Sequence, residues 1–140
     1  MAIDIQKVLV EDEDVLGRFQ VEILAPSTDG WAPAVMAIEA LVTNYRLLLK
    51  PFKKKYQHAS IPNYFITSVD EAKLSNFPCL TICIKTGHSF HLVVPRRHKK
   101  KLYDSLLKMH IPKPKFKMDE TVARNDIQRL VSFFERWMPS

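Results

Sequence analysis

The stretch Ala40-Leu41-Val42-Thr43-Asn44-Tyr45-Arg46-Leu47-Leu48-Leu49 joins two apolar runs through a short polar corner. Thr and Asn favour turns, and apolar runs of this length bounded by turn residues are typical of strands. We therefore predict a strand over residues 35–42, a turn at Thr43-Asn44 and a return strand over 45–50. The alanine and methionine content of 35–42 also suits a short helix.

Working outward from this hairpin, other segments alternate apolar and polar residues or gather β-branched residues, which predicts further strands. These strands cover residues 15–24, 59–69, 80–84 and 90–94. Turn-forming residues mark 26–33 and 70–78 as connections, and Gly87 marks a hairpin turn over 85–88.

Two helical patterns follow the last predicted strand. After Pro95, a basic run opens a segment in which Leu102, Leu106 and Met109 share one helix face. A closing helix is predicted over 119–138, with an apolar stripe of Val122, Ile127, Leu130, Val131, Phe134, Trp137 and Met138. The predicted fold is α+β and mainly β: a strongly bent antiparallel sheet or partly open barrel of about seven strands, closed by the C-terminal helix.

The order of these segments resembles GRAM-type members of the pleckstrin-homology-like (PH-like) superfamily. The resemblance rests on a T-N-x-R-L corner at 43–47, an I-P-x-x-x-I-x-x-V strand at 61–69 and a K-T-G turn at 85–87, and it spans roughly 14–94. It implies a binding module that attaches to membranes through anionic or phosphoinositide lipid, or docks proteins. Two departures from the family pattern are visible. The loop between the first two strands carries Asp29 and no basic residue, and 97–109 is either an inserted helix or precedes a strand near 116–118.

The length of 140 residues suits one domain, here 1–140 with a lead-in over 1–13. Apolar residues make up 46% of the chain, which is typical of a globular protein. No run approaches the ~20 apolar residues that span a bilayer, and the acidic residues 11–14 do not resemble a secretory signal. Cys79 and Cys83 are expected to be reduced thiols. We therefore expect a cytoplasmic protein that attaches peripherally to membranes.

The net charge is +6, and it is unevenly spread, because acidic residues dominate the first thirty positions. Basic residues on loops after strand ends can hold phosphate groups and are attracted to anionic lipid. The predicted lipid contact is Lys50, Lys53, Lys54, Lys55, Arg96, Arg97, Lys99, Lys100 and Lys101. Alternatives are a solvated basic surface, or a protein partner or second copy that uses a sheet edge or Trp31. Nucleic acid is the least favoured partner, because no nucleic-acid-binding motif is readable.

Catalytic patterns are missing from the sequence. It contains no G-x-S-x-G or H-E-x-x-H motif, and His88 and His91 are spaced poorly for a shared metal. With three glycines the chain also has no glycine-rich phosphate loop. We therefore predict no enzymatic activity, no cofactor and no metal.

Overall fold

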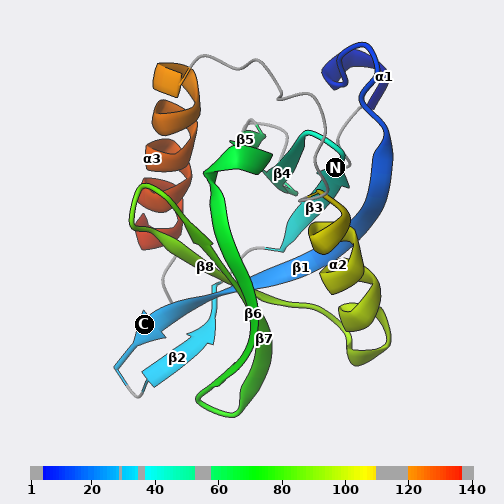
Figure 1. Cartoon of the computed structure of the whole chain (residues 1–140). Coiled ribbons are helices and arrows are strands. Elements are labelled where there is room, and N and C mark those ends of the chain that lie inside the picture. The colour runs from blue at the N-terminus through cyan, green and yellow to red at the C-terminus, as the bar shows by residue number, and fades with distance from the viewer. Residues whose placement is uncertain (1–4, 29, 35–36, 53–57, 110–119, 137–140) are drawn as a thin grey trace.

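The structure is a computed structural model of the chain and describes residues 5–28, 30–34, 37–52, 58–109 and 120–136. Eight strands in this part of the chain form one antiparallel sheet, and two long helices follow it (Figure 1). The strands are β1 (Val15–Ser27), β2 (Gly30–Pro33), β3 (Ile38–Thr43), β4 (Arg46–Pro51), β5 (Ala59–Pro62), β6 (Ile66–Leu74), β7 (Phe77–Ile84) and β8 (Ser89–Val93). The helices are α1 (Ile5–Val8), the 3-10 turn η1 (Asn63–Phe65), α2 (Arg96–Met109) and α3 (Glu120–Arg136).

The long strand β1 holds the two halves of the sheet together. The strand order is β5-β4-β3-β1-β8-β7-β6, with β2 paired to the end of β1. β1 pairs with β3 from Val15 to Val21, but with β8 only at Glu22 and Ile23. The two outer strands, β5 and β6, are joined directly by η1. The sheet is therefore strongly bent but not closed, which confirms the mainly β, α+β class.

Two segments predicted as connections contain strand residues. The first adds the strand β2 and the second lengthens β6 and β7, while the split of 59–69 into β5 and β6 adds another strand. The 26–33 segment contains the end of β1 and β2, paired through Ala25 and Ala32. The 70–78 segment continues β6 into a hairpin with β7 that turns at Ser75 and Asn76, both at positive φ. Short polar residues tolerate that backbone region, so this turn needs no glycine.

The predicted strand over 59–69 is interrupted by η1. Pro62 has no N–H to continue the ladder, and the N–H of Asn63 donates to the carbonyl of Tyr45 at 2.8 Å. This turn places the ring of Phe65 in the core, where it is fully buried. The interruption therefore bends the chain from one half of the sheet to the other.

Both helices lie where the sequence predicts them. In α2 the residues Leu102, Leu106 and Met109 are fully buried in the core, as expected. Among the α3 stripe residues whose side chains the structure describes, Val122 is wrongly predicted, because it is 49% exposed and Ala123 takes the buried place beside Ile127 and Leu130. The side chain of Phe134 is not among those described. The part of the closing-helix prediction at 119 and 137–138 falls outside the described residues.

Helix α3 also protects the outer edge of β5. The carboxylate of Asp126 accepts a hydrogen bond from the N–H of Ser60 at 3.1 Å, and Arg129 donates to the carbonyl of His58 at 2.7 Å. Exposed strand edges tend to pair with other chains. The side chains of α3 therefore supply the partners that a further strand would otherwise supply.

The polar corner at Thr43-Asn44 anchors the lead-in to the sheet. Arg46 donates to both carboxylate oxygens of Glu13, from Nε at 2.9 Å and from Nη2 at 3.0 Å. The hydroxyl of Thr43 donates to the same carboxylate at 2.6 Å, and the side chain of Asn44 accepts from the N–H of Asp14 at 2.7 Å. The side chains of Glu13 and Arg46 are buried. The turn residues thus bind a segment about thirty positions earlier in the chain.

This carboxylate is expected to make the fold sensitive to acid. Burial alone would raise the pKa of Glu13, but hydrogen bonds from Arg46, Thr43 and the N–H of Val10 hold that pKa below its usual value. A lowered pKa contributes stability above the unfolded value, and that contribution is lost as the pH falls through the folded value. The difference in thermal midpoint between the wild type and Glu13→Gln should therefore narrow as the pH falls from 7 to below about 4. A difference that stays constant over this range would contradict the assignment.

Candidate functional site

The most basic surface of the described chain is the start of α2. Five of its first six residues are arginine or lysine, and its first turn contains no acidic residue. The N-terminus of a helix carries partial positive charge, so each cation there is unfavourable by about 0.3–1 kcal/mol. Helix N-termini bind anions for the same reason. The sequence thus concentrates positive charge where the backbone already attracts anions.

The basic residues of α2 are divided between two environments. Arg96, Arg97, Lys100 and Lys101 are exposed, whereas Lys99 is half-buried and forms an ion pair with Glu71, at 3.5 Å between Nζ and Oε1. Residues Arg96, Lys100 and Leu107 are spaced to share one face of α2, about 120° around the helix from Leu102 and Leu106. We call these three residues the α2 stripe. Leu107 is 43% exposed, so the stripe begins with cations and ends with an exposed apolar side chain.

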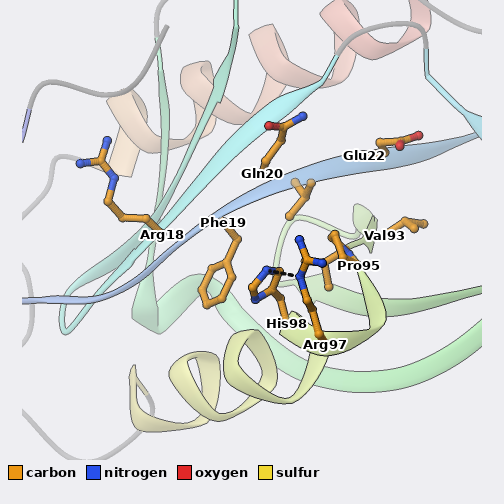
Figure 2. A pocket seen from close by; sticks show the side chains of 10 residues that line it. Arg18, Phe19, Gln20, Glu22, Val93, Pro95, Arg97 and His98 are labelled. Atoms are coloured by element: carbon orange, nitrogen blue, oxygen red, sulfur yellow. Dashed lines mark hydrogen bonds between the residues drawn. The ribbon is translucent and has the colours of Figure 1, made fainter.

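A groove lies beside the start of α2. It has a volume of about 560 Å³ and is lined by residues 18–22 of β1, residues 93–95 at the end of β8, and Arg97 and His98 of α2. In Figure 2 the ring of Phe19 points toward α2, and Arg97 and His98 lie together on that same side of β1. Arg97 Nε donates to His98 Nε2 at 3.1 Å. One wall of the groove is therefore the edge of a strand and the other is the basic end of a helix.

The predicted lipid contact is only partly assembled. Arg96, Arg97, Lys99, Lys100 and Lys101 belong to one helix, not to a loop as predicted, because 96–109 contains neither glycine nor proline and is rich in helix-forming Arg, Lys and Leu. Lys50 lies on β4, where it is paired with Glu39 of β3. Its side chain is on the sheet face away from the buried Leu47 and Leu49, and its Nζ donates to the carbonyl of Pro51 at 3.2 Å. Since α2 packs on the core side, Lys50 is not part of the same surface. Lys53, Lys54 and Lys55 lie outside the described residues.

A second recess of about 390 Å³ is lined by residues 23–26 of β1, residues 88–91 at the start of β8, Trp31 and Val131. It contains Trp31, which is half-buried with its ring edge-on to His91 at 4.8 Å between centroids. Burial lowers the pKa of His91, and Thr81 Oγ1 lies 2.8 Å from His91 Nδ1. The lining contains no lysine or arginine, so this recess adds nothing to the basic surface. Trp31 packs against the sheet and is not a fully exposed anchor.

Within the described ranges, no group of three or more histidine, cysteine, aspartate or glutamate side chains is placed to hold a metal ion. Cys79 is buried and Cys83 half-buried, and both are free thiols. None of the described helices is long and apolar enough to cross a membrane.

Comparison with known proteins gives information on the fold alone. No family model matches the chain, and no curated protein matches it. Among solved structures, the chain is similar to the C-terminal domain of an unknown protein from Leishmania infantum, with a TM-score of 0.55 and 16% sequence identity. That similarity covers 69% of this chain and 84% of the other. This structural similarity therefore shows a shared fold alone.

Proposed function

We propose that this chain is a non-catalytic, GRAM-type PH-like module that attaches reversibly to anionic membranes at the cytoplasmic face, with the start of α2 as its contact. The PH-like part of the proposal is supported by the strand order, by the bend at β1 and by the helix that follows the sheet. The membrane part is supported by the distribution of charge on α2.

The membrane proposal rests on one observation, the cluster of exposed cations at the start of α2. Each Lys or Arg near an anionic leaflet contributes about 1 kcal/mol. The exposed Arg96, Arg97, Lys100 and Lys101 together would contribute about 4 kcal/mol, or about a thousandfold in binding. Bound anionic headgroups would also relieve the unfavourable placement of cations at a helix N-terminus. Leu107 at the far end of the stripe is placed to enter the interface beside them.

Co-sedimentation with vesicles tests this proposal. Lys100→Glu changes the local charge by two units and should weaken binding to phosphatidylserine vesicles by about thirtyfold. Lys100 is exposed, and glutamate forms helices about as well as lysine does, so weaker binding would not reflect unfolding. Lys7→Glu is the matched control. It makes the same charge change at an exposed residue of α1, whose Val8 packs against Leu48 on the sheet face away from α2, and it should have little effect.

Equal effects of the two substitutions, or no binding of the wild type to anionic vesicles at physiological salt, would overturn the proposal. A second arm compares vesicles with phosphatidylserine against vesicles with phosphoinositide at matched surface charge. Equal binding indicates that the surface responds to charge alone, and stronger binding to phosphoinositide indicates recognition of its headgroup. A salt titration with RNA tests the nucleic-acid alternative, which predicts a steep loss of affinity.

A further inference from the structure

The backbone of β1 presents an unpaired edge to the groove beside α2. In an extended strand the N–H and C=O of one residue point to the same edge, and successive residues alternate. The carbonyl of Ile23 accepts a hydrogen bond from the N–H of Ala34 at 2.7 Å. The backbone N–H and C=O groups of odd-numbered residues in this part of β1 therefore point to β2 and β3. Gln20 and Glu22 therefore direct their backbone groups to the opposite edge, where β8 lies.

The pairing between β1 and β8 stops because of Pro95. Glu22 is paired with Val93, so continued antiparallel pairing would place Gln20 opposite Pro95. A proline has no N–H to donate, and the carbonyl of Pro95 already accepts from the N–H of His98 at 2.8 Å as α2 begins. Within the described part of the chain, the N–H and C=O of Gln20 therefore have no strand partner on this edge, and they form no hydrogen bond outside the sheet.

The chain itself indicates that this edge accepts hydrogen bonds from other groups. Four residues earlier on the same edge of β1, the hydroxyl of Ser105 on α2 donates to the carbonyl of Leu16 at 3.3 Å. Thus α2 occupies the edge at Leu16, β8 occupies it at Glu22, and the groove lies between them. The groove of about 560 Å³ falls within the ~300–1,000 Å³ of ligand-binding clefts.

The charges around the groove are asymmetric. Arg97 is exposed at the α2 wall, next to the positive end of the helix. The exposed carboxylate of Glu22 belongs to the β1 wall, and in Figure 2 its side chain lies on the other side of the strand from Arg97 and His98. A segment lying in the groove would therefore meet positive charge on the α2 side.

We propose that an extended, acidic peptide segment of a partner protein binds here as an added strand. Its backbone pairs with the N–H and C=O of Gln20 along the β1 edge, where β8 would otherwise have continued. A carboxylate of the segment meets Arg97 and the start of α2. Backbone pairing gives the affinity in this mode of recognition, and the acidic contact gives the specificity. This proposal goes beyond the membrane proposal. The two share Arg97 and the start of α2, but the peptide also needs the edge of β1.

The test titrates the full chain with the peptide acetyl-Thr-Val-Glu-Val-Thr-amide and follows backbone amide signals by NMR. Gln20→Pro removes the groove-facing N–H without removing a hydrogen bond between β1 and β3, and edge positions tolerate proline. We expect it to weaken binding by about tenfold or more. Gln20→Ala is the matched control, because it removes the side chain and keeps the backbone group, and it should bind as the wild type does.

The expected shifts for the wild type centre on Gln20, Glu22 and His98. Arg97→Gln, or a peptide with glutamine in place of its glutamate, should weaken binding by about three- to tenfold. Absence of binding at millimolar peptide, shifts confined to another surface, or equal affinity of Gln20→Pro and Gln20→Ala would overturn the proposal. Gln20→Pro should leave vesicle binding unchanged, which separates this result from that of the membrane experiment.

Discussion

Substitution of Arg46 by methionine is expected to lower the free energy of unfolding by about 3–5 kcal/mol. The substitution leaves the carboxylate of Glu13 buried without its counter-charge, and it also removes hydrogen bonds to Ser60 Oγ at 3.0 Å and to the carbonyl of Val8 at 2.9 Å. A domain of this size is stable by only about 5–15 kcal/mol. Urea denaturation followed by circular dichroism measures the loss.

Two controls distinguish the loss of the buried Glu13–Arg46 ion pair from the loss of a charged side chain elsewhere. Arg124→Met breaks the ion pair with Glu120, in which the two side chains are 50% and 54% exposed, so the loss should be much smaller than that of Arg46→Met. The double variant Glu13→Leu with Arg46→Met should be more stable than Arg46→Met alone, because no unpaired charge stays buried. If Arg46→Met lowers the free energy of unfolding no more than Arg124→Met does, the Glu13–Arg46 pair does not anchor the lead-in as described.

Substitution of Phe65 by alanine is expected to cost about 3–5 kcal/mol, because a fully buried phenylalanine leaves a cavity when it is truncated. The ring lies between the two halves of the sheet, next to the ring of Tyr64 at 5.4 Å between centroids. The Nζ of Lys85 lies 4.3 Å from the centre of the Phe65 ring, so the substitution also removes a cation–π contact. Urea denaturation again measures the effect.

The neighbouring residue provides the comparison for Phe65. Tyr64 is in the same turn but only half-buried, so Tyr64→Ala should cost clearly less than Phe65→Ala. The loss of stability for Phe65→Leu should be smaller than that for Phe65→Ala, because leucine fills part of the volume of the ring. Equal losses for Phe65→Ala and Tyr64→Ala would show that the bend does not depend on the buried ring.

Local pattern predicted most elements of this fold. The polar corner at Thr43-Asn44 and the strands around it follow from turn preference and apolar runs, which act over a few residues. The buried face of α2 follows from helical spacing, since Leu102, Leu106 and Met109 are all in the core. The strands in 26–33 and 70–78 were missed because their turn residues sit at the tips of hairpins whose strands have weak alternation.

For the candidate site, the sequence identified the basic run at 96–101, but it did not predict which residues lie around that run in the fold. That Lys50 lies on the opposite sheet face from α2 depends on which side of β4 packs against the core. The groove was also not predictable, because it needs β1 and β8 to meet and then separate. Pro95 was a visible signal, but its effect on Gln20 requires the register between residues that are far apart in the chain.

The sequence by itself determined the element types, the mainly β class and the concentration of positive charge after Pro95, because these properties depend on residues close together in the chain. Only the tertiary structure decided the bend at Phe65, the burial of Glu13 against Arg46 and the open edge at Gln20. Each of these depends on strand register and on which faces become buried, and both are set by packing between residues about thirty or more positions apart, or across the sheet.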